Sequence, residues 1–224
     1  MCGRFAFYSP AEATAALFGV TGSLDVKPRY NIAPTQYVAA IRNNEEQQAE
    51  LTSFRWGLVP FWAKDPSIGN RMINARAETV AEKPSFRNAY RKRRCLILAD
   101  GFYEWHTEGG VKIPYFISLA NGEPLAFAGL WENWQSKETG ETLETTTIVT
   151  TEANEFLQQL HHRMPVVVDP DSAPRWLGGD MEFLGDYAGN CPAFRAWPVD
   201  RKVNNARNEA PDLTEPAGDE LAAR

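Results

Sequence analysis

Residues 95–105 carry the sequence CLILADGFYEW, in which two short strand-like runs follow one another directly. The apolar run over 95–100 is typical of a buried strand, and a second run, 101–105, begins at a glycine. Further runs of this kind, each bounded by Gly, Pro or Asn, cover 3–8, 36–42, 51–59, 113–119, 125–131 and 145–151. Such a series of short strands predicts antiparallel pairing in a curled sheet or a pseudo-barrel.

Helical patterns are few and lie between the strands. Ser9 can cap a helix that has a proline at its first position and reaches about Phe18. A second stretch covers about 77–91 and is interrupted at Pro84, and a third follows Thr151. We therefore predict the α+β class, with helices at the periphery of one sheet or barrel.

The chain length of 224 residues suits one large domain and is short for two. We place this domain at 1–207. Residues 208–224 are acidic and rich in Pro and Ala, with five acidic residues against one arginine from Glu209 onward. We expect this tail to be disordered, because it has too little apolar surface to bury.

The two halves of the chain differ in charge, although the whole chain carries a net charge of −6. Residues 1–100 hold 14 Lys and Arg against 9 Asp and Glu, whereas 101–224 hold 9 against 20. This asymmetry leaves room for a local cationic groove. The three cysteines form no disulfide framework, and no signal peptide or membrane-spanning run is present, so we expect a cytoplasmic protein.

The chain begins with Met1-Cys2-Gly3-Arg4-Phe5, which places a cysteine directly behind the initiator methionine. Once Met1 is removed, Cys2 carries a free α-amine beside its thiol, with unperturbed pKa values of about 8 and about 8.5. Such an aminothiol condenses with an aldehyde first as a Schiff base and then, by thiol closure, as a thiazolidine. The simpler alternative is that Cys2 is a small residue at the start of a strand.

Four further islands combine polar residues with turn-forming ones. Asn74 and Arg76 are two positions apart, so on an extended segment they point to one face. Glu104 lies among aromatic residues, a setting that raises a carboxyl pKa toward the range of acid–base catalysis. The other two islands are the loop 29–34 and the segment 161–165 at a predicted helix end.

Each island also has a purely structural explanation. Asn31 and Asn74 could bond their own backbone in turns. Glu104 could be an interior carboxylate paired with an arginine, and a histidine at a helix C-terminus interacts favourably with the helix dipole. Each feature is weak alone, whereas their conjunction in one chain is informative.

Six segments stand in one order along the chain: CGRF at 2–5, YNIAP at 30–34, WGLVPFWA at 56–63, NARAET at 74–79, DGFYEW at 100–105 and HHRMP at 161–165. This arrangement resembles the SRAP (SOS-response-associated peptidase) family, whose members are abasic-site processing proteins. The match runs from residue 2 to about 207, and only the acidic tail lies outside it. The resemblance implies the SRAP fold for residues 1–207.

The resemblance also implies a mechanism in which Cys2, once N-terminal, links covalently to the ring-opened aldehyde of an abasic site in single-stranded DNA. Asn74 would hold the Cys2 amine and the opened sugar, and Glu104 would shuttle protons during Schiff-base formation and ring closure. His161 would act on the sugar hydroxyl, because the family's His-x-Arg-Met-Pro pattern puts His162 in the variable position. Imine formation needs an unprotonated amine and an acid that helps to expel water, in agreement with these roles.

The residue types indicate how DNA would be bound. Arginines suit bidentate phosphate contacts, and a tryptophan beside a proline offers a flat apolar surface for stacking on a base. The predicted DNA-binding residues are Arg4, Asn31, Pro34, Trp62, Arg76 and Arg163. Trp62 could instead fill the core, and the basic cluster 91–94 could equally be a solvated helix end.

The sequence contains no recognisable zinc pattern and no phosphate-binding glycine motif, so we expect no metal and no cofactor. The expected partner is single-stranded DNA that contains abasic sites, and no membrane. We expect a monomer that associates with the nucleoid when DNA is damaged. AP lyase and autopeptidase activities would accompany the crosslinking reaction.

Two other function classes stay open. One is an N-terminal-nucleophile cysteine peptidase or amidase, with Cys2, His161 and Asn74 or Glu104 as the relay. Class II glutamine amidotransferases share the Cys-Gly start, but they usually carry an aliphatic residue where this chain has Arg4. The other class is a non-enzymatic binding module for single strands or modified bases. Only the SRAP interpretation predicts a protein–DNA adduct that survives denaturation.

Overall fold

Five strands close into a ring in the computed structural model, which describes residues 2–187 and 191–222. These strands are β3 (Tyr37–Asn43), β4 (Ala49–Trp56), β6 (Arg94–Ala99), β9 (Leu125–Gln135) and β10 (Thr142–Glu152). Their order is β10–β4–β3–β6–β9, and β9 pairs with β10 again. The predicted pseudo-barrel in an α+β domain is thus confirmed, in the form of a closed barrel.

The barrel sheet is mixed. β10 runs parallel to β4 and also to the short β5 (Asn74–Arg76). The prediction of antiparallel pairing is wrong for these two pairs, because strand direction depends on long connections that a local sequence pattern does not contain. Two short strands, β11 (Arg163–Pro165) and β12 (Val167–Val168), extend the sheet beside β10 and β9.

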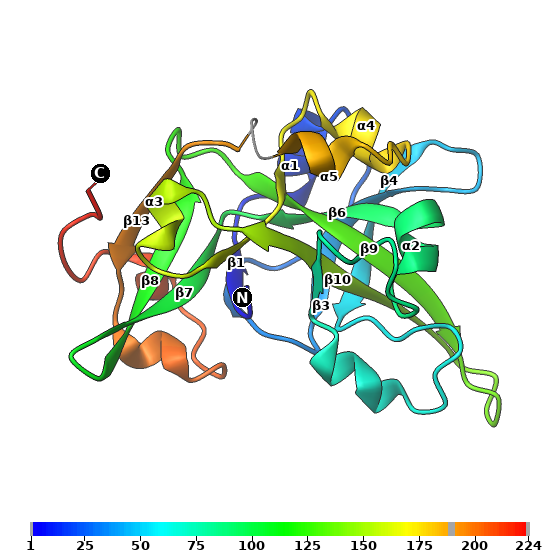
Figure 1. Cartoon of the computed structure of the whole chain (residues 1–224), viewed down its shortest axis with the longest axis horizontal. Helices are drawn as coiled ribbons and strands as arrows, with labels where there is room; N and C mark the ends of the chain where they lie inside the picture. Colours follow the sequence, from blue (N-terminus) through cyan, green and yellow to red (C-terminus); the bar gives the residue numbers. More distant parts are fainter. Residues whose placement is uncertain (1, 188–190, 223–224) are drawn as a thin grey trace.

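A second, antiparallel sheet packs against the barrel, with β7, β8 and β13 to the left of the barrel strands in Figure 1. Its strands in order are β13 (Phe194–Pro198), β8 (Val111–Leu119), β7 (Gly101–Glu108), β1 (Phe5–Phe7) and β2 (Arg29–Ile32). The ring centroid of Phe5 lies 5.2 Å from that of Trp56 and 5.6 Å from that of Phe127. All three side chains are fully buried, so the core between the sheets begins directly behind the start of the chain.

The stretch 95–105 passes from one sheet into the other. β6 belongs to the barrel and β7 to the second sheet, and only Asp100 separates them. A Cβ atom at Gly101 would lie 2.4 Å from the ring of Phe116 and 2.5 Å from the carbonyl oxygen of Ile117. Only glycine lets β7 approach β8 so closely at the point where the chain changes sheets.

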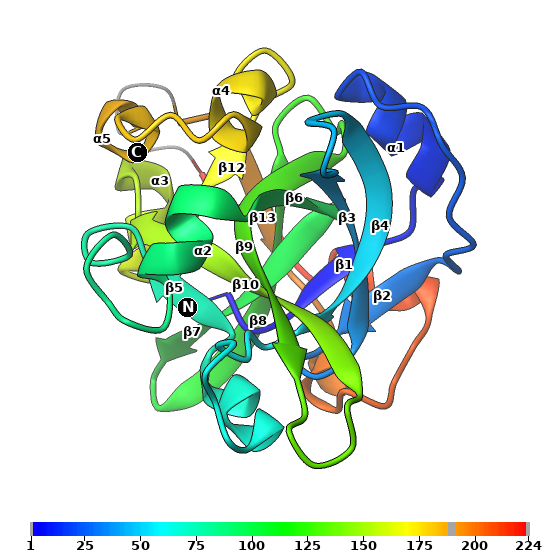
Figure 2. The same cartoon turned by 90° about the vertical axis from the view of Figure 1, so that its right-hand side faces the viewer.

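Helices lie around the outside of the strands (Figures 1 and 2). They are α1 (Ala11–Leu17), α2 (Arg87–Lys92), α3 (Glu155–Gln158), α4 (Ala173–Leu177) and α5 (Phe183–Asp186). α1 and α3 confirm two predicted helices. The helix predicted over 77–91 is wrong before Arg87, because the chain forms turns there and Pro84 cannot continue a helix from the preceding turn. In the described ranges, no helix is long and apolar enough to cross a membrane.

The acidic tail contacts the domain at several points of its described part, residues 208–222, although most of these residues are exposed. Leu213 is buried in a short 3-10 helix (Pro211–Thr214), and the amide of Leu221 donates to the carbonyl oxygen of Ala196 on β13 at 2.7 Å. The sequence predicts a disordered tail, and these contacts are the ones that its described residues make with the domain. The tail is acidic on average, but its leucines Leu213 and Leu221 pack against apolar side chains of the domain. The last two residues of the chain lie outside the described part.

Candidate active site and nucleic-acid interface

Cys2 is fully buried just before β1, and Asn74 holds its backbone. The side-chain amide of Asn74 donates to the carbonyl oxygen of Cys2 at 2.7 Å. Within the described part of the chain, the buried Oδ1 of Asn74 has no hydrogen-bond partner, so an acceptor is available near Cys2. Met1, whose removal would free the α-amine of Cys2, lies outside the described residues.

Strand pairing brings Glu104 to the same place. β1 and β7 pair with Phe5 opposite Phe102, and the amide of Tyr103 donates to the carbonyl oxygen of Arg4 at 2.9 Å. Glu104 follows next on β7, so it lies level with the residues that precede Arg4. Only 5% of Glu104 is exposed. A carboxyl group from β7 and an amide from β5 therefore approach the start of the chain from two different strands.

The electrostatics of this place favour neutral groups. Burial raises the pKa of the Glu104 carboxyl, and the positive charge of His162 works in the opposite direction. Burial, and after it the charge of Glu104, raises the pKa of the Cys2 thiol far above its ordinary value. The thiol is therefore neutral, and it lies beside a carboxyl group that is better able than an ordinary glutamate to exchange protons near neutral pH.

His161 follows α3 and is held by the backbone of the next strand. The amide of Arg163 donates to Nδ1 of His161 at 2.9 Å, and the two histidine rings stack with their centroids 4.3 Å apart. Burial is the main cause of a lowered His161 pKa. His161 is half-buried and His162 is exposed, so the two neighbouring rings differ in their access to solvent.

Arg163 forms a buried clamp. Its two terminal nitrogens donate to the Glu78 carboxylate at 2.6 and 2.9 Å, and one also donates to the carbonyl oxygen of Thr150 at 2.7 Å. The clamp joins the histidine segment to the residues that follow β5. The sequence predicts that Arg163 contacts DNA; its guanidinium is paired with Glu78 and 9% exposed, and the contact with DNA stays a prediction.

Arg4 and Asn31 bind the start of the chain to its C-terminal part. Nη1 of Arg4 donates to Oδ1 of Asn31 at 2.7 Å and to the carbonyl oxygen of Val203 at 2.9 Å. The side-chain amide of the fully buried Asn31 donates to the carbonyl oxygens of Asn205 at 3.0 Å and Asn208 at 2.9 Å. The sequence predicts DNA binding for both residues; the structure adds that they join the start of the chain to its C-terminal part, and their contact with DNA stays a prediction.

Arg76 is the arginine of the predicted DNA-binding set that is exposed. Asn74 and Arg76 share one face of β5, as predicted, because Ala75 between them is buried. Arg76 faces a surface hollow of about 500 Å³. The hollow is lined by Arg76, Glu152, Gln158, His162 and Arg163.

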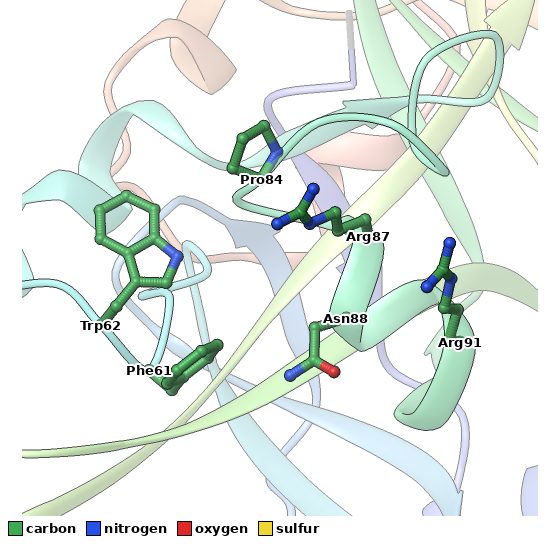
Figure 3. Close-up of a pocket in the computed structure, with 6 residues that line it drawn as sticks. All are labelled: Phe61, Trp62, Pro84, Arg87, Asn88 and Arg91. Atoms are coloured by element: carbon green, nitrogen blue, oxygen red, sulfur yellow. The ribbon is translucent and has the colours of Figure 1, made fainter.

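Trp62 lies in the turn after β4 and is 46% exposed, which excludes the alternative that it fills the core. Pro34 is half-buried in the turn after β2. Trp62 faces α2 across a hollow of about 280 Å³ (Figure 3). The hollow is lined by Phe61, Trp62, Pro84, Arg87, Asn88 and Arg91.

Three residues that line this hollow were missed from the sequence. Phe61 is 54% exposed beside Trp62, and Arg87 lies one helical turn before Arg91 on α2. The spacing of the two arginines is a helical signal, but the interrupted helix predicted over 77–91 obscured it. Asn88 between them had no signal of its own. In the ranges 2–187 and 191–222, no group of three or more His, Cys, Asp or Glu residues is placed to hold a metal ion.

Comparison with known proteins agrees with this architecture. The family model described as SOS response associated peptidase (SRAP) matches residues 1–206. The chain is 41% identical over 224 residues to abasic site processing protein YoqW of Bacillus subtilis strain 168, which covers 96% of this chain and 99% of that protein. It is 34% identical over 228 residues to abasic site processing protein YedK of Escherichia coli strain K12, with 96% and 100% covered. A crystal structure of a protein from Bacteroides thetaiotaomicron has a TM-score of 0.83 at 26% identity, with 96% of this chain and 100% of that one covered. The chain belongs to the SRAP family.

Proposed function

We propose that this protein processes abasic sites in single-stranded DNA through a covalent reaction at Cys2. The observation that carries the proposal is the convergence of Asn74 and Glu104 on the buried Cys2. A nucleophile, a proton carrier and an orienting amide are the groups that covalent capture of an aldehyde needs. The similarity to proteins named for abasic site processing supports this choice of substrate.

The reaction begins at the α-amine of Cys2, which is free once Met1 has been removed. The amine adds to the aldehyde carbon of the ring-opened abasic sugar, and loss of water from the carbinolamine gives an imine. The thiol sulfur then adds to the imine carbon, and the thiol proton passes to the nitrogen to give a thiazolidine. One water leaves in total, and no oxidant or reductant is required. β-Elimination from the same imine would cleave the strand, which is the AP lyase side reaction.

Each neighbouring group has a defined task. Glu104 donates a proton to the departing hydroxyl and later accepts the proton of the neutral thiol, and its raised pKa suits both steps. Asn74 fixes the Cys2 backbone and offers Oδ1 as an acceptor for the amine. His161 has a lowered pKa, so it is neutral at neutral pH and can accept a proton from the sugar hydroxyl.

The hollow beside Trp62 supports a single-stranded substrate. Trp62 and Phe61 offer exposed rings on one wall, and Arg87 and Arg91 offer cations on the other. A continuous duplex keeps its bases stacked on one another, so it has no free base to place on these rings. Phosphate contacts by arginine also make binding sensitive to salt.

We expect an oligonucleotide with one abasic site to form an adduct that survives denaturation. Its mass should equal that of the protein from Cys2 onward plus that of the DNA, less one water. Denaturing gels and intact-mass spectrometry measure both quantities. A strand with a tetrahydrofuran spacer, which has no aldehyde, should give no adduct. An adduct whose protein part retains Met1 would refute the aminothiol mechanism.

Trp62→Ala should weaken binding of single-stranded DNA by about 1–3 kcal/mol, the contribution of one stacked base. The adduct should also form more slowly at low DNA concentration, while the thermal unfolding midpoint stays unchanged. Tyr37→Ala is the matched control, because Tyr37 is an exposed aromatic residue that lines a different hollow. Equal adduct yields from an abasic site in single strand and in continuous duplex would contradict the proposed interface.

A further inference from the structure

One buried carboxylate joins the two walls of the hollow beside Trp62. Glu132 on β9 is 2% exposed, and its Oε2 accepts a hydrogen bond from the backbone amide of Phe61 at 3.2 Å. Its Oε1 forms an ion pair with Arg93, the residue that directly follows α2. Glu132 therefore contacts the turn that carries the aromatic rings and also the end of the helix that carries the arginines.

The next residue on the same face of β9 holds the other side of the aromatic turn. Trp134 is buried, and its indole nitrogen donates to the carbonyl oxygen of Ala63 at 2.7 Å. Trp134 and Ala63 also pack with Val59 in a small apolar cluster. Glu132 and Trp134 thus bind the backbone on both sides of Trp62, so the position of this turn is set by β9.

We propose that Glu132 is a positioning residue for nucleic-acid binding, which holds the Phe61–Trp62 turn at a fixed separation from α2. The preformed gap then receives one nucleotide of a single strand, with its base on the aromatic rings and its phosphate on Arg87 and Arg91. The affinity for DNA increases because the two walls are already ordered before DNA binds, so binding does not bear the entropy cost of ordering them. This inference takes the identity of its ligand from the proposed function.

The energetics of Glu132 favour this role over a contribution to stability. Burial raises the pKa of its carboxyl, so the fold holds the ionised form at a cost that Arg93 and the Phe61 amide only partly offset. The Arg93 side chain is 23% exposed and stays solvated when its partner is removed. Neutralising Glu132 therefore changes the alignment of the walls without leaving a buried, unpaired charge.

The test is Glu132→Gln, which keeps an oxygen for the Phe61 amide and removes the ion pair. Fluorescence anisotropy with unmodified single-stranded oligothymidine should show binding weakened by about tenfold. The adduct-forming rate at saturating abasic DNA should stay at the wild-type value, and the thermal unfolding midpoint should not fall. A merely structural role would lower the unfolding midpoint and the maximal rate together. Arg93→Met removes the same ion pair from the other wall, and Glu132 can then take up a proton because burial already raises its pKa. This variant should give the same loss of binding, even if Glu132→Gln does not fold.

Two controls sharpen the outcome. Glu144→Gln on the neighbouring β10 breaks a similar pair with Arg42, of 2.6 Å, in another hollow, and should leave binding unchanged. In protein that carries Trp62→Ala and Arg87→Ala, Glu132→Gln should have no further effect. The inference would be overturned if Glu132→Gln bound oligothymidine as tightly as the wild type. It would also be overturned if Glu132→Gln weakened binding by the same factor in the Trp62→Ala, Arg87→Ala protein as in the wild type. A wild-type protein that binds oligothymidine but forms no adduct would count against the proposed function alone.

Discussion

Cys2→Ala should reduce the heat-stable DNA adduct by at least ~10³-fold, because the variant removes the nucleophile that completes the crosslink. The alanine still carries an α-amine once Met1 is removed, so the imine can form and the strand can be cleaved by elimination. Borohydride should therefore trap the variant on DNA, whereas without reduction the variant should leave only nicked product on a denaturing gel.

The matched control is Cys191→Ala. Cys191 is another free cysteine and is partly exposed, so it is more accessible than Cys2 in the folded protein. This variant should keep the wild-type adduct yield. Wild-type yield from Cys2→Ala, or loss of the adduct in Cys191→Ala, would assign the nucleophile to a different residue.

Glu104→Gln should slow adduct formation by ~10²–10⁴-fold, the usual contribution of a positioned general acid or base. The amide preserves the shape of the side chain but exchanges no proton, so dehydration of the carbinolamine and deprotonation of the thiol both lose their partner. Single-turnover kinetics measure the rate. Glu108→Gln, an exposed position at the end of the same strand, should react at the wild-type rate.

The pH profile tests the same residue with a defined sign. Burial raises the Glu104 pKa, so the acid form persists to higher pH than in an unfolded chain. The wild-type rate should be bell-shaped, because the reaction needs the acid form of Glu104 and the free base of the amine. Glu104→Gln should instead rise to a plateau, since only the amine titrates. If the pH–rate profile of Glu104→Gln were still bell-shaped, the acid would be a group other than Glu104.

Local sequence patterns were sufficient for most strands of the barrel and of the second sheet, but they did not predict the short strands β2, β5, β11, β12 and β13. The run 95–105 predicted two consecutive strands, and β6 and β7 lie there because its apolar residues enter one core and Gly101 permits the close crossing. The spacing of Asn74 and Arg76 predicted their shared face. Strand alternation and turn glycines act over a few residues, so they are visible without a structure.

Long-range pairing decided the features that the sequence did not predict. No local pattern shows that Arg163 pairs with Glu78, which lies 85 residues away along the chain. The role of Asn31 likewise depends on carbonyl groups more than 170 residues later. Arg87 and Phe61 form one hollow only because β9 brings the turn and α2 together.

The bonds from Arg4 to the C-terminal part of the chain set an order of events during synthesis. Arg4 and Val203 are 199 residues apart, so the first segment leaves the ribosome long before its last partner exists. Throughout that interval the bond after Met1 is accessible to an aminopeptidase, whereas the completed fold buries Cys2 entirely. Removal of Met1, which the proposed function requires, therefore has its widest time window on the nascent chain, before the bonds between Arg4 and the C-terminal part form.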